Sequence, residues 1–532
     1  MDHERAFLEA IGEHPDDDLH RLAWADWLEE HGQGERAAFV RAQLEAAKQP
    51  GTRQADDQAD EADDLLARHE ADWAGRISEV ALEWRWRRGC IEQVTLWADA
   101  LLTHGEALFG EAPIRRVRLL AEPDELPRLA DCPWLARVEW LDLSRSREHS
   151  NCVGPFLRDR PLAALFRSRY LERLTALHLG GHGVEGPAVQ ALAETGLLAG
   201  LRRLDLTGNV AVGDRVARLL AETSAPHLRR LGLDQTNLTA YGVRALLAAR
   251  RAPELTWLDV NLGLLFRQGV SPELLRRELL ETPLAGQLRG VKFAGAAFDA
   301  PSLDALLRAP LASRLERLEL SRTWLGEEEI ALLGGCASLS RLRKLRLGEN
   351  KLRDRGVRAL LGPGHLTELT ELDLGHNNVG GPGIRAVLGG EGPGQLRRLS
   401  LAGNHVGVTG SEILAQAPRP RRLMELDLRQ CHLDTEAMVA LTRSDALSRL
   451  RRLDLSNNQL GDEGVRRLAQ SSTLARLERL HLDGNAVDSP GAQALLESPH
   501  LGRVRWLSLR NAYITSNERE QLRARFGPAT QF

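Results

Sequence analysis

The sequence predicts an α/β solenoid, a stack of similar units in which short parallel strands alternate with helices. Three observations predict this fold. A motif of the form LxxLxLxxN returns at a nearly constant interval, and each copy is followed by an amphipathic helical pattern. The chain has 532 residues, which is far more than one globular core holds. A repeat array solves this problem, because its core grows in one direction only.

The motif is clearest where Leu201 is followed by Leu204, Leu206 and Asn209. Strong copies begin at Leu201, Leu228, Leu255, Leu288, Leu315, Leu342, Leu369, Leu396, Leu423, Leu450, Leu477 and Val504. From Leu288 to Val504 there are eight consecutive intervals of 27 residues, which chance does not produce. Weaker copies begin at Ile91, Ile114, Val138 and Leu174, so we expect about sixteen units.

Each unit divides into a strand half and a helix half. The LxL segment alternates inward and outward side chains, as a short strand does. The segment from Gly461 places Val465, Leu468 and Ala469 on one helical face, with Asp462 as the expected N-cap. Neither half buries its apolar face alone. Stacked units therefore share one core, with parallel strands on the concave side and helices on the convex side.

The ninth position of the motif indicates a second shared feature. It holds an asparagine in six units, namely Asn209, Asn350, Asn377, Asn404, Asn458 and Asn485. A buried amide there both donates to and accepts from backbone groups of neighbouring turns, so we interpret these residues as a structural ladder. Cys431 occupies the same position, and we expect it to pack there without a redox or metal-binding role.

From about residue 90 to residue 515 the chain resembles the leucine-rich-repeat family, ribonuclease-inhibitor-like subclass. The resemblance implies a horseshoe-shaped solenoid. It implies little about function, because the family binds many unrelated partners.

We expect four segments along the chain. They are a helical domain at 1–48, an acidic linker with a capping helix at 49–88, the solenoid at 89–515 and a C-terminal cap at 516–532. The first domain shows three apolar stripes, one with Phe7, Leu8 and Ile11, one with Leu19, Leu22, Trp27 and Leu28, and one with Phe39, Val40 and Leu44. Its string Asp16–Ala46 resembles the small repeat-companion domain of some large-genome bacteria, and we therefore expect a bacterial protein.

Composition excludes several classes of function. The net charge is -4, from 70 basic and 74 acidic side chains, so nothing draws the whole chain to nucleic acid or membrane. The five cysteines are scattered and contain no CxxC pair, which argues against a metal site or a disulfide framework. The N-terminus has acids where a signal peptide needs basic residues, and no apolar run is long enough to span a bilayer. We expect a cytoplasmic protein without a membrane segment.

No motif predicts catalysis. The segment Gly181–Gly186 matches GxGxxG, but it coincides with the strand-to-helix turn of one repeat. The sequence lacks GxxxxGK[ST], HExxH and GxSxG. We therefore expect no enzyme activity, no cofactor and no metal.

The strand surface is the predicted binding surface. Trp140, Trp257 and Trp506 all hold the third motif position, which also carries Arg203 and Arg230. Such tryptophans are typical anchors of interfaces, although they also pack on the stems of neighbouring arginines, and both interpretations are open. Two units are longer than the others, with extra residues at 146–155 and 261–272. We predict that Trp257 and the insertion residues Leu264, Leu265, Phe266 and Arg267 form the main contact patch.

These observations favour a monomeric protein-binding scaffold that recognises an unknown protein through its concave face and inserted loops. The alternative is a regulator of an enzyme, either an inhibitor or a GTPase activator, because relatives with this repeat have such roles. Nucleic acid is not an expected partner, since acidic side chains lie among the arginines of the strand surface.

Overall fold

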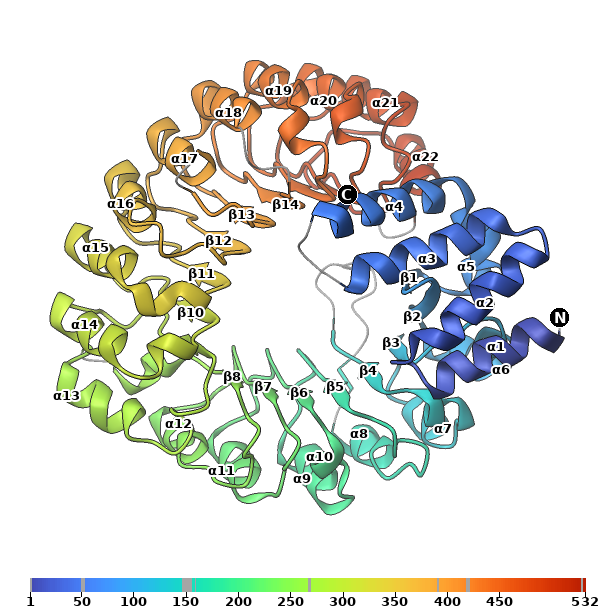
Figure 1. Ribbon diagram of the computed structural model, residues 1–532, viewed down its shortest axis with the longest axis horizontal. Coiled ribbons are helices and arrows are strands. Elements are labelled where there is room, and N and C mark those ends of the chain that lie inside the picture. The colour runs from blue at the N-terminus through green and yellow to red at the C-terminus, as the bar shows by residue number, and fades with distance from the viewer. Residues whose placement is uncertain are drawn as a thin grey trace. The chain divides into compact units, whose positions relative to one another are not determined.

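The computed structural model describes residues 2–48, 53–145, 156–157, 159–266, 269–389, 392–417, 422–527 and 530–532. They form two compact units. Unit 1 contains the described residues up to Leu255, and unit 2 contains those from Thr256 onward. Within each unit, strands lie side by side along one face and helices cover the opposite face (Figure 1). The predicted α/β repeat fold is confirmed in both units.

Unit 1 begins with the three predicted helices, α1 (Asp2–Glu13), α2 (Asp18–Glu30) and α3 (Gly34–Lys48). Their stripes meet in a core that contains Leu8, Ile11, Trp24, Leu28, Val40 and Leu44. One member of a predicted stripe does not belong to it, because Leu19 is 70% exposed in the first turn of α2. The helix instead turns Arg21 and Trp24 inward.

The acidic stretch after residue 52 is helical, and the expectation of a linker there was wrong. It forms the first half of α4 (Arg53–Ala74). Ala55, Ala62 and Leu65 are buried on one side of this helix, and the last two pack against Phe39 of α3. The acidic side chains of Asp57, Glu61 and Asp64 are exposed on the outer side of the helix, where water solvates them.

The strands of unit 1 form one sheet. Its first strand is antiparallel to the second, and the others are parallel. The strands are β1 (Glu83–Arg87), β2 (Cys90–Trp97), β3 (Arg116–Leu120), β4 (Trp140–Asp142), β5 (Ala176–His178), β6 (Arg203–Asp205) and β7 (Arg230–Gly232). The helices after α4 are α5 (Ile77–Val80), α6 (Ala98–Glu111), α7 (Leu126–Ala130), α8 (Asp159–Leu165), α9 (Gly186–Glu194), α10 (Leu197–Gly200), α11 (Asp214–Glu222) and α12 (Ala240–Leu247).

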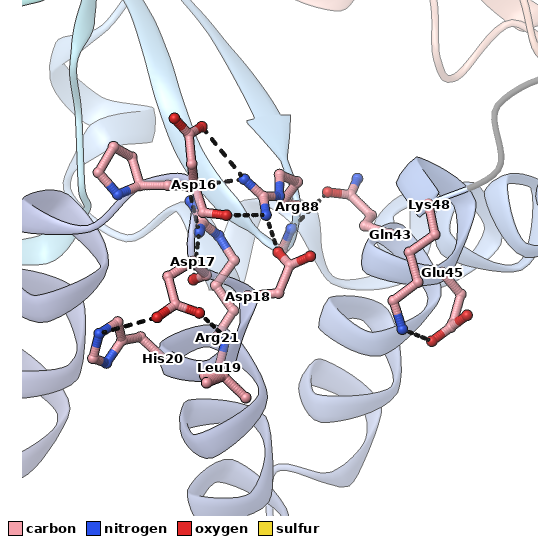
Figure 2. Close-up of polar contacts among 12 residues, drawn as sticks. Asp16, Asp17, Asp18, Leu19, His20, Arg21, Gln43, Glu45, Lys48 and Arg88 are labelled. Carbon is pink, nitrogen blue, oxygen red and sulfur yellow. Dashed lines mark hydrogen bonds and ion pairs between the residues drawn. The ribbon is translucent and has the colours of Figure 1, made fainter.

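The N-terminal helices pack directly on the first strands of this sheet. Arg21 is fully buried, and its Nη2 donates to the Glu92 carboxylate on β2 at 2.6 Å. Arg88, in the turn between β1 and β2, donates to the backbone oxygen of Pro15 at 2.8 Å and pairs with Asp18 (Figure 2). In the same turn, the Gly89 amide donates a hydrogen bond to Oε1 of Gln43 on α3 at 2.8 Å. The helices thus cover the open end of the repeat core in unit 1, as a cap does.

Unit 2 continues the alternation with parallel strands only. The strands are β8 (Trp257–Asp259), β9 (Gly290–Lys292), β10 (Arg317–Glu319), β11 (Lys344–Arg346), β12 (Glu371–Asp373), β13 (Arg398–Ser400), β14 (Glu425–Asp427), β15 (Arg452–Asp454), β16 (Arg479–His481) and β17 (Trp506–Ser508). The helices are α13 (Pro272–Leu275), α14 (Ala300–Arg308), α15 (Glu327–Gly335), α16 (Arg353–Leu361), α17 (Gly381–Leu388), α18 (Gly407–Gln416), α19 (Thr435–Thr442), α20 (Gly461–Ala469), α21 (Ser489–Glu497) and α22 (Ser516–Phe526).

The ninth-position asparagines link neighbouring repeats through buried amides. Asn404 is 1% exposed, and its Oδ1 accepts from the amides of Asn377 and Val379 at 3.0 and 2.9 Å. Its Nδ2 donates to the carbonyls of Leu374 and Leu401 at 2.8 Å each. Asn209, Asn350, Asn377, Asn458 and Asn485 are also buried and bridge repeats in the same way. Each amide satisfies backbone groups that the tight turn would leave without partners.

A cysteine and a threonine occupy the same position in two other repeats. Cys431 is fully buried, and its thiol donates to the Leu401 carbonyl at 3.1 Å. Thr323 is also buried and donates from Oγ1 to the Leu320 carbonyl at 2.5 Å. Burial raises the pKa of the Cys431 thiol to about 12, so it stays protonated at neutral pH.

A row of aspartates on the helix side joins neighbouring helices. The sequence predicted that Asp462 caps its own helix. The structure shows that it does not, because Asp462 lies inside the first turn of α20. Its Oδ1 accepts from the amides of Asp488 and Gly491 at the start of α21, at 2.8 and 3.0 Å. Asp214 and Asp354 hold the starts of α12 and α17 in the same way. Capping between repeats thus fixes the spacing of adjacent helices.

A polar helix, α22, follows the last strand of unit 2. In α22 a capping box forms, in which Thr515 accepts from the Glu518 amide while Glu518 accepts from Thr515. The chain then returns, and Gln531 bridges β17 next to Ser508. This bridge partly covers the edge of the last strand.

Candidate partner-binding surfaces

We call the first and third residues of each three-residue strand, with their equivalents on β1, β2 and β3, the strand face of a unit. The middle residue of these strands is buried in the leucine core, while most first and third residues keep some exposure. The strand face therefore carries side chains that the core does not need. Neighbouring parallel strands hold them in register, about 4.8 Å apart.

The strand face of unit 2 is balanced in charge. Seven basic residues, Lys292, Arg317, Lys344, Arg346, Arg398, Arg452 and Arg479, stand against seven acidic residues, Asp259, Glu319, Glu371, Asp373, Glu425, Asp427 and Asp454. Ion pairs link strand to strand. Examples are Lys344 with Glu371 at 2.8 Å and Arg398 with Glu425 at 3.1 Å. Each half-exposed pair contributes only about 0–1 kcal/mol, so the network chiefly neutralises the surface.

The pKa values of two carboxylates in this network are shifted in opposite directions. Burial opposes ionisation of Glu371, but hydrogen bonds from Lys344 and Arg346 outweigh it and lower the pKa to about 2. Asp454 shows the opposite result. Burial, reinforced by repulsion from Asp427, raises its pKa to about 6 although Arg429 lies 3.3 Å away. The strand face of unit 2 therefore carries its full negative charge only above about pH 6, where Asp454 is ionised.

The strand face of unit 1 is organised around an aromatic and imidazole pair. The Trp140 indole donates from Nε1 to His178 Nε2 at 3.1 Å, and His178 Nδ1 lies 3.5 Å from an Asp205 oxygen. The Arg116 guanidinium lies over the Trp140 ring, 4.8 Å from its centroid. Burial, with repulsion from Arg203, lowers the His178 pKa to about 4, so the imidazole is neutral at pH 7. A neutral ring accepts from the indole and presents its other N–H to Asp205.

Arginines outnumber acids on this face. It carries Arg85, Arg87, Arg116, Arg118, Arg203 and Arg230 against Glu83, Asp142 and Asp205. Arg118 lies 3.9 Å from Asp142. Burial lowers the Arg116 pKa to about 10, and repulsion from Arg87 and Arg115 adds to this effect. The side chain remains cationic at neutral pH, within a crowded group of guanidinium ions.

The structure places the three predicted tryptophans differently. Trp140 and Trp257 are half-buried on their strand faces. The Trp257 ring covers Gly290 of the next strand, where an added Cβ would lie 2.8 Å from it. Trp506 is only 4% exposed and packs 4.0 Å from the His481 ring. The prediction that Trp506 is an exposed anchor was therefore wrong.

The predicted contact patch at the second insertion also needs correction. Phe266 is 2% exposed and packs 6.0 Å from the Phe293 ring. Leu262 and Leu265 are buried in the preceding single turn, so the insertion adds to the core of unit 2. Arg267 and the first insertion, 146–155, lie outside the described residues. Arg203 and Arg230 are half-exposed neighbours in register on β6 and β7.

A tryptophan that the sequence analysis missed is the most exposed of the described tryptophans. Trp324 is 69% exposed, in the turn between β10 and α15. Its φ is +62°, a left-handed conformation that a bulky side chain rarely adopts. Lys351 of the next repeat lies 5.3 Å from its ring centroid. The sequence contained a signal, since the equivalent residues Lys351, Asn378 and His405 are all polar.

Some kinds of site are not seen in the part of the chain that the structure describes. No group of three or more His, Cys, Asp or Glu side chains there is placed to hold a metal ion. Cys90, Cys132, Cys336 and Cys431 are free thiols. None of the described helices has the length and apolar character needed to cross a bilayer.

The family of the repeats follows from four segments of unit 2. A family model described as "Leucine Rich repeat" matches residues 340–361, 365–388, 448–469 and 476–496. Each matched segment contains one strand and one helix of the array. The chain contains leucine-rich repeats. A search of curated proteins finds no match to the chain.

Several solved structures are similar to this chain. A yeast complex of Rad7 and Elc1 contains a chain with 21% identity and a TM-score of 0.47, over 62% of this chain and 84% of that one. An internalin from Listeria monocytogenes has 16% identity and a TM-score of 0.31, over 70% and 92%. A leucine-rich-repeat protein of Leptospira interrogans has 19% identity and a TM-score of 0.31, over 76% and 98%. The assignment of leucine-rich repeats rests on the matched segments and the 27-residue period, and not on these structural similarities.

Proposed function

We propose that this chain is a protein-binding scaffold, without catalytic activity of its own, that recognises another protein through its strand faces and the adjoining turns. The observation that carries the proposal is Trp324. An indole that is 69% exposed leaves a large apolar surface in water, and exposed tryptophans beside cationic side chains are characteristic anchors of protein interfaces.

The turn holds this side chain in place. Arg322 and Trp324 both have left-handed backbone conformations, and Arg322 pairs with Glu349 of the next repeat at 2.5 Å. The equivalent residues His376 and Asn378 of another repeat are left-handed too, so the common geometry of the repeat turn fixes the backbone at Trp324. A rigid anchor loses little conformational entropy when a partner binds.

The finer features belong to the same proposal. Units of 27 residues with helices of two turns or more support the ribonuclease-inhibitor-like subclass. The helices α1, α2 and α3 support a companion domain that also serves as the N-terminal cap. We propose that the protein acts in the bacterial cytoplasm as a monomer.

Replacement of Trp324 by alanine should reduce partner binding at least tenfold, because loss of a central tryptophan anchor removes about 2 kcal/mol or more of binding free energy. The measurement is quantitative capture from a lysate of the source organism, with tagged wild type and the Trp324→Ala variant compared by mass spectrometry. Tyr241→Ala is the matched control, since Tyr241 is 70% exposed in the first turn of helix α12. Equal recovery of every captured protein by wild type and Trp324→Ala would contradict the assigned anchor.

A further inference from the structure

The two strand faces differ in how their charges are compensated. In unit 2 the basic side chains Lys344, Arg346 and Arg398 each lie within 4 Å of a carboxylate on a neighbouring strand. In unit 1, Arg85, Arg87, Arg116 and Arg203 have no ion pair with any carboxylate in the part of the chain that the structure describes. Both faces are built from the same kind of repeat. The difference in ion pairing therefore comes from the side chains at these positions and not from the backbone.

Two adjacent arginines make the contrast sharper. Arg203 and Arg230 lie in register on neighbouring strands, where like charges repel. The Arg203 Nε is buried and has no hydrogen-bond partner. A buried N–H without a partner costs about 1–3 kcal/mol, and an incoming carboxylate would remove that cost.

We propose that the strand face of unit 1 binds an acidic segment of a partner protein, with the carboxylates of the segment held by Arg116 and Arg203. This rests on the proposed function and names the chemistry of the partner. Guanidinium groups recognise carboxylates through paired hydrogen bonds, and half-buried guanidinium groups do so more strongly than fully exposed ones.

The spacing of the two arginines limits the segment. They lie on β3 and β6, three strand intervals apart, which corresponds to about 14 Å. An extended peptide covers this distance in about four residues. A segment with carboxylates about four residues apart therefore reaches both guanidinium groups.

An acidic protein segment fits this face better than nucleic acid. Asp142 and Asp205 lie among the arginines and would repel a continuous row of phosphates. The Trp140 ring is already covered by Arg116 and tied to His178, so it offers no free surface for base stacking. Separate carboxylates avoid the two aspartates, while phosphates at every nucleotide do not.

The test uses the full chain and fluorescein-labelled deca-glutamate as the probe, with binding followed by fluorescence anisotropy at low and high salt. We expect salt-sensitive binding by wild type that falls about tenfold or more in the Arg116→Ser, Arg203→Ser double variant. The matched control is Arg398→Ser, Arg452→Ser, which makes the same changes at the same repeat position in unit 2 and should bind as wild type does. A third variant, Arg116→Lys, Arg203→Lys, keeps the charges and should recover part of the affinity.

Three results would overturn this inference. They are no binding of deca-glutamate by wild type, equal losses in the two serine double variants, and tighter binding of a fluorescein-labelled deoxythymidine 12-mer, which would assign the face to nucleic acid. Failure here leaves the proposed function standing if Trp324→Ala still loses a captured protein. If capture is also unaffected, both proposals fail.

Discussion

Replacing Asn404 with alanine is expected to lower the free energy of unfolding by about 3–5 kcal/mol. The side chain is buried and satisfies two amides and two carbonyls of neighbouring turns. Alanine leaves the two amides and the Leu374 carbonyl without partners, leaves the Leu401 carbonyl with only the Cys431 thiol, and opens a cavity. Urea denaturation followed by circular dichroism at 222 nm measures the change.

Cys431 predicts a graded result at the same position. Its thiol replaces one of the donors, so Asn404→Cys should cost less than Asn404→Ala. Gln459→Ala is the control, because Gln459 is exposed in a nearby turn and should change stability by less than about 0.5 kcal/mol. A loss below about 1 kcal/mol in Asn404→Ala would show that the ladder does not hold the repeats together.

Arg21→Ala should destabilise the chain by about 3–5 kcal/mol, because it leaves the Glu92 carboxylate in a buried site without its main partner. Arg21 is 0% exposed and Glu92 1% exposed, and their charged groups are 2.6 Å apart. Arg115 lies 3.1 Å from the same carboxylate and compensates only in part. Chemical denaturation monitored by circular dichroism gives the comparison with wild type.

The double variant Arg21→Met, Glu92→Met separates the charge effect from packing. It removes both charges and keeps the apolar volume between α2 and β2, so it should be more stable than Arg21→Ala. Arg41→Ala is the exposed control, since the Arg41 ion pairs with Asp26 and Glu29 lie at the surface. If the double variant is as unstable as Arg21→Ala, the contribution of the buried pair is not electrostatic.

The repeat fold could be predicted because its core follows a strict period. Leucines such as Leu204 and Leu206 recur at positions that only one register of strand and helix can bury, and eight equal intervals exclude other registers. The ladder asparagines were predictable for the same reason, since a polar residue that recurs inside an apolar pattern must find backbone partners.

The candidate site was harder to predict, because the repeat position alone does not determine exposure. Trp506 and Trp257 share one motif position. Trp506, however, lies on the last strand, β17, where it packs on His481 of β16 and where Gln531 pairs with Ser508. Phe266 followed an insertion that seemed to be a surface loop, although its apolar residues Leu262 and Leu265 indicated core packing. Side-chain size and long-range neighbours decide these cases.

The sequence predicted the balance of basic and acidic residues only as an average over all strand positions, and not for each unit. The sequence showed arginines and acids mixed over the whole strand surface, but it did not show that Lys344, Arg346 and Arg398 of unit 2 are paired while Arg116 and Arg203 of unit 1 have no such partner among the described residues. Ion pairs depend on which strands are neighbours and on distances of a few ångströms. Trp324 lies outside the strand positions, in a turn whose equivalent residues Lys351, Asn378 and His405 are polar.

The central claim is that the strand side of the repeats, and not the helix side, binds a protein. Site-specific photo-cross-linking in cells of the source organism tests it most directly, with benzoylphenylalanine in place of Thr207 or Ser400 on the strand side. Arg215 and Arg358, which are exposed on α11 and α16, provide the helix-side controls. We predict a discrete cross-linked protein from one or both strand-side positions and none from the helix side. Cross-links from the helix positions alone would contradict the claim.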